Sequence, residues 1–172
     1  MTELKHYEIV VIGAGPGGYA AAFRAADLGK QVLLVDRDNE LGGVCLNRGC
    51  IPSKALLHIS KVMSDAEHLS KMGVTYGKPA IDIDQVRAHK NKIVSQLNLG
   101  IAQMAKARKV ETIQGMATFK SNSELNIETE DGHISISFDK CIIAAGSTSA
   151  MIPGVPSDHP SILTSKTALD LV

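Results

Sequence analysis

A short apolar run, Glu8–Ile12, passes directly into the sequence Gly13-Ala14-Gly15-Pro16-Gly17-Gly18. The run is rich in β-branched residues, which is typical of a buried strand in a parallel sheet. Gly13 would make the tight turn, Gly15 would let the backbone approach a phosphate group, and Gly18 would let the next helix pack close to the strand. The spacing of these three glycines therefore predicts a nucleotide-binding turn between a strand and a helix.

A helix and a second strand follow in the order that a nucleotide-binding βαβ unit requires. The Ala-rich stretch Pro16–Leu28 predicts the helix, because Pro is tolerated in a first turn and Gly29 is a typical C-terminal stop. The apolar run Gln31–Val35 predicts the strand, which ends at Asp36. We expect the Asp36 carboxylate to accept hydrogen bonds from ribose hydroxyls, which disfavours NADP. The free N–H groups of the helix would face a pyrophosphate, but the pattern alone does not separate FAD from NAD.

Two cysteines follow this unit, in the run Gly42-Gly43-Val44-Cys45-Leu46-Asn47-Arg48-Gly49-Cys50-Ile51-Pro52-Ser53-Lys54. In an ideal helix, residues five apart are about 7.5 Å apart along the axis and lie on different faces. A disulfide needs Cα atoms within roughly 7 Å, so a bridge between Cys45 and Cys50 requires an irregular turn. Gly49 supplies the backbone freedom, and Pro52 suits the start of a regular helix over about residues 53–71.

Other uses of these cysteines have to be weighed against a redox pair. A zinc site needs four ligands, and no second pair stands at metal spacing, so we expect no metal. Two inert, reduced core cysteines are a further reading, and it is the one we adopt for Cys141, which lies in an apolar run. Nothing marks a secreted protein, which disfavours a structural disulfide. A dithiol beside a nucleotide can exchange two electrons with a flavin, so the cysteines favour FAD.

The run GGVCLNRGCIPSK resembles the redox motif of the pyridine nucleotide-disulfide oxidoreductases. With GAGPGGYAAAFRAADLG before it and KALLH after it, the chain is most similar to the dihydrolipoamide dehydrogenase branch of that family. Glutathione and mercuric reductases share the general motif. The resemblance extends along essentially all 172 residues but matches only the amino-terminal part of the family's chain.

The resemblance implies a role for each side chain of the motif. Cys45 would be the exchange thiol that attacks the dithiol substrate, and Cys50 would lie against the flavin and make a charge-transfer contact with it. Lys54 would sit near the reactive edge of the isoalloxazine. The positions that would bind FAD are Gly13, Gly15, Pro16, Gly18, Asp36, Arg37, Gly42, Gly43, Val44, Cys45, Lys54, Ala117, Ala145, Gly146 and Ser147.

Three of these positions depart from the family's pattern. Asp36 stands where many members have Glu, which shortens the side chain but keeps its charge. Ala117 occupies a position that is often Gly. Ala145 replaces a Thr in the turn Ile143-Ala144-Ala145-Gly146-Ser147, so a hydroxyl contact with FAD would be lost there.

The resemblance also implies an activity for the complete enzyme. A dihydrolipoyl group of a 2-oxo acid dehydrogenase or glycine cleavage complex would reduce the disulfide, and electrons would pass through FAD to NAD within a homodimer. The alternatives are another flavin disulfide reductase, of the glutathione or mercuric type, and a non-catalytic flavin-binding fragment. We find no second glycine fingerprint for NAD and no match to the family's His-Glu acid-base pair. We therefore do not expect these 172 residues to turn over alone.

Composition bounds the remaining possibilities. The 18 basic and 18 acidic residues give a formal net charge of zero, so no basic field favours nucleic acid. No stretch approaches 18 consecutive apolar residues, so we expect no membrane span. The first residues have no signal or transit character, which leads us to expect a cytoplasmic protein with a catalytic rather than a structural disulfide.

The remainder of the chain predicts an α/β fold: a Rossmann-like FAD-binding domain with a parallel sheet and a small antiparallel β insertion. We expect this domain over residues 1–150, and over residues 151–172 a loop and linker toward an absent NAD-binding domain. The stretch Val86–Arg108 predicts a long helix with Asp84 as its cap. The strands predicted after it are Val110–Gln114, Glu124–Thr129, His133–Phe138 and a final buried strand, Lys140–Ala144, with a hairpin turn at residues 130–132.

Overall fold

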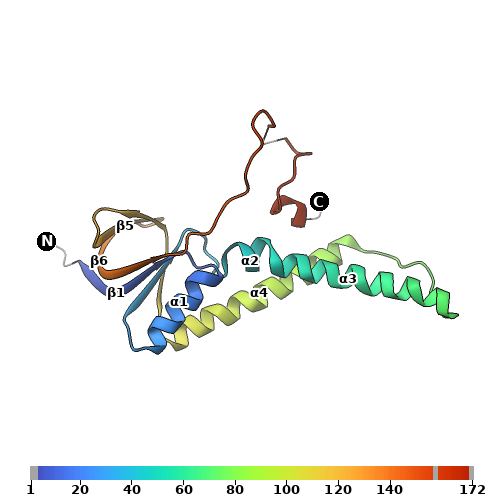
Figure 1. The fold of residues 1–172 in the computed structure, drawn as a ribbon, viewed down its shortest axis with the longest axis horizontal. Coiled ribbons are helices and arrows are strands. Elements are labelled where there is room, and N and C mark those ends of the chain that lie inside the picture. Colours follow the sequence, from blue (N-terminus) through green and yellow to red (C-terminus); the bar gives the residue numbers. More distant parts are fainter. Residues whose placement is uncertain (1–3, 157–158, 171–172) are drawn as a thin grey trace. The chain divides into compact units, whose positions relative to one another are not determined.

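The sheet is built around β1 (Lys5–Ile12), which has a parallel neighbour on each side. The computed structural model describes residues 4–156 and 159–170. Its six strands lie in the order β3-β2-β1-β6-β5-β4. The other strands are β2 (Val32–Asp36), β3 (Glu111–Gln114), β4 (Met116–Phe119), β5 (Glu124–Thr129) and β6 (Gly132–Ile143). β1, β2 and β3 are parallel, whereas β4, β5 and the first part of β6 are antiparallel, which confirms the predicted fold class (Figure 1).

β6 is one continuous strand, so the prediction of two strands divided at Asp139 was wrong. Its first half pairs antiparallel with β5, from Gly132 to Ser137, and it pairs parallel with β1 from Ile136 to Ile143. The polar residues that suggested a break are simply exposed positions of a strand. The same topology explains a second correction, because the end of β6 is not buried: Ile143 is 67% exposed. Beyond Ser137, within the described residues, β6 has a partner strand on one edge only.

The helix α1 (Pro16–Asp27) forms the crossover between β1 and β2 and packs on both strands. Its buried face carries small side chains and one ring, Ala22, Ala25 and Phe23. Gly29 adopts a φ of +81° after the helix and donates its N–H to the Ala26 carbonyl, as expected of a C-terminal stop. The predicted strand–helix–strand order is therefore confirmed, with the helix ending one residue early.

Both parts of the sheet contribute to one hydrophobic core. Side chains from the parallel strands meet side chains from the antiparallel hairpin, and most of them are fully enclosed. The cluster consists of Tyr7, Val10, Leu33, Val35, Leu125, Ile127, Ile136 and Phe138. This shared core fixes the carboxyl ends of β1, β2 and β6 relative to one another. The glycine turn begins at the end of β1.

Three further helices follow the glycine unit in the chain: α2 (Gly43–Arg48), α3 (Cys50–His68), which continues as the 3₁₀ turn η1 (Leu69–Met72), and α4 (Ile83–Ala107). A short 3₁₀ helix, η2 (Thr167–Asp170), lies near the end of the described chain. α4 begins earlier than predicted, and its cap is Asp82 rather than Asp84, because the Gln85 N–H donates to Asp82 Oδ1 at 3.1 Å. α3 also begins early, at Cys50 rather than near Ser53.

The chain separates into two compact units, and the divisions fall within α2, within α4 and after Ser147. Unit 1 comprises Met1–Cys45 and Leu97–Ser147, and it contains the sheet and α1. Unit 2 comprises Leu46–Gln96 and Thr148–Val172. The predicted boundary at residue 150 divides an FAD-binding domain from a linker rather than one compact unit from another. It stays a prediction. Among the described residues, no helix is both long enough and apolar enough to cross a membrane.

Candidate functional site

The glycine turn follows β1 directly, and the main chain leaves no room for a side chain at its first position. Gly13 has a φ of +98°, and a Cβ there would lie 2.2 Å from the Ala144 carbonyl oxygen. The Gly13 N–H donates to the Val35 carbonyl at 2.7 Å, and the Ala144 N–H donates to the Ile12 carbonyl at 2.7 Å. The ends of three neighbouring strands are thereby held together around Gly13.

The helix α1 approaches this turn very closely at Gly18. A Cβ on Gly18 would lie 1.6 Å from the Gly13 carbonyl oxygen, which is far inside van der Waals contact. The requirement for glycine at position 18 is therefore set by the packing of helix on turn, as the sequence pattern predicted.

Gly15 is different, because the space beside it is open. A Cβ on Gly15 would meet no nearby group except the Gly43 Cα at 3.9 Å. Gly15 is also the N-cap of α1, and no side chain caps the helix there. The first N–H groups of a helix attract anions through their unsatisfied donors and the helix dipole. This end of α1 therefore fits a pyrophosphate.

A second glycine pair holds the neighbouring loop against the turn. The Gly42 N–H donates to the Ala14 carbonyl at 2.8 Å. Gly43 has a φ of +58°, and a Cβ there would lie 2.6 Å from the Gly15 Cα. Two backbone segments thus come into direct contact, and Val44 and Cys45 follow at once in α2, the first exposed and the second half-buried.

Asp36 ends β2 and binds the main chain on both of its carboxylate oxygens. Oδ2 accepts the Ala14 N–H at 2.5 Å, and Oδ1 accepts the Asp38 N–H at 2.9 Å. The Asp36 carbonyl accepts the Gly115 N–H at 2.8 Å. The sequence did not reveal these bonds, since an acid at the end of a second strand is equally compatible with a ribose contact. Each carboxylate oxygen can still accept a further hydrogen bond, so these contacts leave room for a ribose hydroxyl. Ribose binding stays a prediction.

The other predicted cofactor residues of unit 1 lie on three segments. Arg37 is exposed and lies 4.0 Å from Asp38, measured from Nε to Oδ1. Ala117 is half-buried on β4, a strand that the sequence analysis missed, and pairs with Ile127. Residues 145–147 follow β6 and are exposed, with Gly146 at a φ of +71°.

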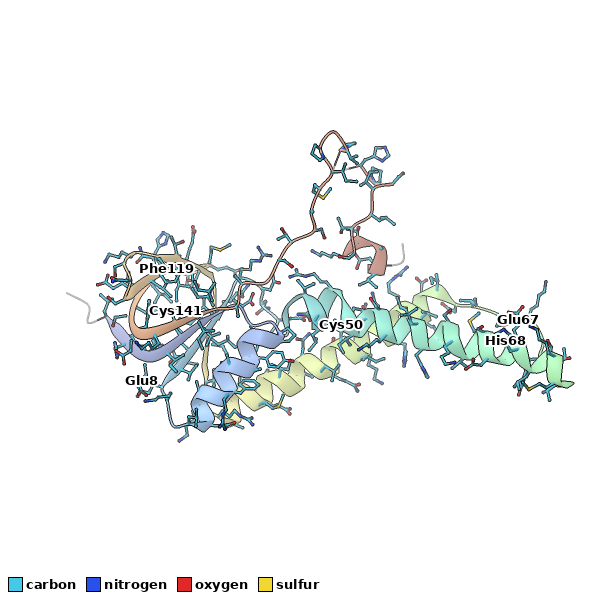
Figure 2. The ribbon with its side chains drawn as sticks, in the orientation of Figure 1. Glu8, Cys50, Glu67, His68, Phe119 and Cys141 are labelled. Atoms are coloured by element: carbon cyan, nitrogen blue, oxygen red, sulfur yellow. The ribbon has the colours of Figure 1, made fainter. Side chains whose placement is uncertain are left out.

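Two cysteines flank a break between helices. Cys45 lies within α2, Cys50 is the first residue of α3, and Gly49 between them has the non-helical angles φ −151° and ψ −110°. The predicted irregular turn at Gly49 is confirmed. Cys50 is exposed (Figure 2), as is Lys54 on the next turn of α3. No disulfide joins the cysteines within the described residues, and the Cys45–Cys50 bridge stays a prediction.

The third cysteine, Cys141, lies on β6 (Figure 2). It is half-buried against the hydrophobic core rather than fully buried. Burial raises the pKa of its thiol, because the thiolate would be poorly solvated there. Among the described residues, no group of three or more His, Cys, Asp or Glu side chains is placed to hold a metal ion.

Comparison with known proteins agrees with this geometry. Residues 7–171 match the family model described as pyridine nucleotide-disulphide oxidoreductase, and the chain belongs to that family. It is 50% identical over 165 residues to a dihydrolipoyl dehydrogenase of Haemophilus influenzae, and 48% identical over 164 residues to one of Vibrio cholerae. Each alignment covers 95% of this chain and 34% of the relative, so the chain spans about a third of the length of these relatives.

A solved structure gives the same picture. The HOCl-induced flavoprotein disulfide reductase RclA of Escherichia coli matches with a TM-score of 0.79 and 27% sequence identity. The match covers 96% of this chain and 34% of that one. The chain therefore has the fold of the amino-terminal, flavin-binding part of a flavoprotein disulfide reductase.

Proposed function

We propose that this chain is the FAD-binding, thiol-bearing part of a dihydrolipoamide dehydrogenase. The observation that carries the proposal is the open space beside Gly15 at the uncapped start of α1, followed in the chain by two cysteines on either side of a helix break. The relatives of 48–50% identity are dihydrolipoyl dehydrogenases, which supports a dihydrolipoyl group as the substrate.

The residues of unit 1 would hold the cofactor through its pyrophosphate and its ribose. The N–H groups at the start of α1 would bind the pyrophosphate, and Asp36 would keep the turn in place through the Ala14 N–H while accepting a ribose hydroxyl. When bound, FAD supplies a two-electron acceptor that a dithiol alone lacks. The exposed Lys54 on α3 is the proposed neighbour of its reactive edge.

The two cysteines would carry out thiol–disulfide exchange. In the oxidised pair, a substrate thiolate attacks the sulfur of Cys45, the Cys45–Cys50 bond breaks, and Cys50 leaves as a thiolate. The second substrate thiolate then attacks the mixed disulfide, which releases Cys45 as a thiolate and the substrate as a cyclic disulfide. Two electrons thus pass from the substrate to the cysteine pair.

The complete enzyme would use NAD as the final acceptor and act as a homodimer. Its substrate would be the dihydrolipoyl group of a 2-oxo acid dehydrogenase or glycine cleavage complex. We place this chemistry in the cytoplasm, where a reducing poise suits a catalytic disulfide.

Cofactor binding is tested at Gly15. Gly15→Val should abolish FAD binding, because the side chain would fill the space that the pyrophosphate needs, whereas the fold has room for a Cβ there. Gly77→Val is the matched control, because a Cβ on Gly77 would likewise be free of close contacts, with nothing within 4 Å, and Gly77 lies in the loop after α3 and η1. Binding is followed by flavin fluorescence, with circular dichroism to check the fold. Equal FAD affinity in the two variants would contradict the site.

The redox pair is tested by peptide mapping. Mass spectrometry after alkylation, with and without reductant, should show one bridge between Cys45 and Cys50. Cys141→Ser should leave that bridge intact. A bridge that includes Cys141 would refute the assignment.

The substrate class is tested with the complete gene product. Activity with dihydrolipoamide and NAD, and none with NADPH and glutathione disulfide, would support the proposal. The reverse pattern would favour a glutathione-type reductase.

A further inference from the structure

A lysine of α4 is almost fully buried and binds a main-chain carbonyl. Lys90 is 5% exposed, and its Nζ donates to the Leu169 carbonyl at 2.5 Å. One turn earlier on α4, Arg87 Nε donates to the Asp170 carbonyl at 2.8 Å. Both carbonyls belong to the last residues of η2, and all four residues lie in unit 2.

The segment that these cations hold has little apolar surface to bury. We call residues 159–170 the strap. Of its residues, all are exposed except Thr164 and Leu169, which are half-buried. Burial of apolar surface supplies most of the stabilisation of ordinary packed segments. The strap therefore depends mainly on hydrogen bonds for its attachment to α4.

The strap is internally ordered at the point where it is held. The Thr164 N–H donates to Thr167 Oγ1 at 2.8 Å, and the Thr167 N–H donates to Thr164 Oγ1 at 3.3 Å. The Ala168 N–H donates to the Thr164 carbonyl at 3.0 Å. This reciprocal pair shapes the single turn of η2, so that its last carbonyls are presented together.

Arg87 is held in place from its own helix. Its NH1 donates to Asp84 Oδ1 at 2.7 Å, while Nε binds the strap. Cationic side chains near the end of a helix bind its last carbonyls, and hydrogen bonds from charged donors are among the strong ones. The strap thus meets two charged donors, one buried and one fixed by an ion pair.

We propose that Lys90 and Arg87 form a reversible latch that fastens the strap to α4. In the fastened state the Lys90 ammonium is desolvated, which costs free energy that its bond to the Leu169 carbonyl offsets. In the released state water solvates both the ammonium and the carbonyl. Because little apolar burial favours the fastened state, its stability rests mainly on the two charged hydrogen bonds, and the strap opens locally while the rest of the chain stays folded. This inference goes beyond the proposed function, since neither residue belongs to the cofactor or thiol site.

The latch is tested by amide hydrogen exchange measured by NMR on the 172-residue chain. Lys90→Met keeps the apolar stem and removes the charged donor, and Arg87→Met does the same one turn earlier. Relative to the amides of α4, the Ala168 and Leu169 amides should exchange roughly ten- to a hundredfold faster in each variant, the scale expected for loss of a charged hydrogen bond. Lys92→Met is the control, because Lys92 lies on the same helix and is exposed, and it should leave these rates unchanged.

Circular dichroism establishes that each variant is folded. If Lys90→Met does not fold, Arg87→Met decides the matter, because its side chain is only partly enclosed, at 30% exposure. Unchanged exchange of the strap amides in the folded variants would overturn the latch. A change of the same size in Lys92→Met would overturn it as well.

Discussion

At the residue scale, Gly17 and Gly18 are neighbours in α1 but meet different surroundings. A Cβ on Gly18 would collide with the Gly13 carbonyl oxygen, whereas a Cβ on Gly17 would meet nothing within 4 Å. Gly18→Ala should therefore lower the free energy of unfolding by about 2–3 kcal/mol or more, because backbone has to move. Gly17→Ala should change it by less than about 1 kcal/mol and in the stabilising direction, because Ala favours a helix. Urea denaturation measures both, and equal effects would show that the close approach is absent.

Glu8 gives a prediction about pH. The Lys30 ammonium, which donates to Glu8 Oε1 at 2.8 Å, and then the Gln31 N–H hold the pKa of this carboxyl below its ordinary value of 4.5. A lowered pKa in the folded state means that the stabilisation is present above pH 4.5 and is lost as pH falls below it. Glu8→Gln should therefore show a smaller loss of stability than the unmodified chain between about pH 6 and about pH 3.

Lys30→Met separates the two causes of this shift. It removes the ammonium but keeps the Gln31 N–H, so its loss of stability on acidification should fall between those of the unmodified chain and Glu8→Gln. Denaturation curves at several pH values give the slope of the free energy of unfolding against pH for the unmodified chain and for each variant. If the stability of Glu8→Gln falls with pH as steeply as that of the unmodified chain, Glu8 does not contribute to the loss of stability in acid.

The residues of the site differ in how far the sequence could predict them. Gly13 and Gly18 were predictable, because a local turn and a close helix determine their environment. The break at Gly49 was predictable from the spacing of two cysteines that a regular helix would separate. The bonds of Asp36 to main-chain N–H groups were not, because they depend on how the turn folds back toward β2, which no local pattern records.

At the element scale, β6 shows where pattern reasoning failed. Its polar residue Asp139 lies mid-strand, and the sequence pattern was interpreted as a boundary between two strands there. The strand continues because β1 pairs with it along this stretch, with Ile9 opposite Lys140 and Val10 opposite Cys141. Pairing with a partner more than a hundred residues earlier is non-local, so the length of β6 required the tertiary fold.

The end of α4 carries an element-scale prediction. Lys109 is the one non-glycine residue with positive φ within the described chain, at +56°, and the Val110 N–H donates to the Ala105 carbonyl at 3.0 Å. This is a helix C-terminus that favours glycine. Lys109→Gly should therefore raise the free energy of unfolding by about 0.5–1 kcal/mol.

Lys106→Gly is the matched control within the same helix. Lys106 lies inside α4, so glycine there should lower the free energy of unfolding by about 1 kcal/mol. The two substitutions, identical in chemistry, should thus act with opposite sign in urea denaturation. The same sign for both would mean that the left-handed conformation at Lys109 does not occur in solution.

At the scale of the whole molecule, the two units differ in what holds them together. Among the described residues, the buried apolar side chains lie almost entirely in unit 1, and Leu46 and Pro52 are the exceptions. The middle of α3 and the loop after it expose large side chains instead, such as Leu57 at 65% and Tyr76 at 62%. Because buried apolar area supplies most of the stabilisation of a folded unit, unit 2 has much less of it to lose on opening.

Local stability should therefore follow this division. We expect amides of β1, β2 and β6 to exchange only through global unfolding, and amides of α3 to exchange through a smaller opening at lower free energy. Hydrogen exchange followed by mass spectrometry should show α3 peptides labelled well before the β1 peptide. The difference between their exchange rates should become smaller as urea favours global unfolding. Exchange of α3 and β1 at one common rate would instead mean that the chain unfolds as a single cooperative body, in which the core around Val10 and Leu33 protects both units.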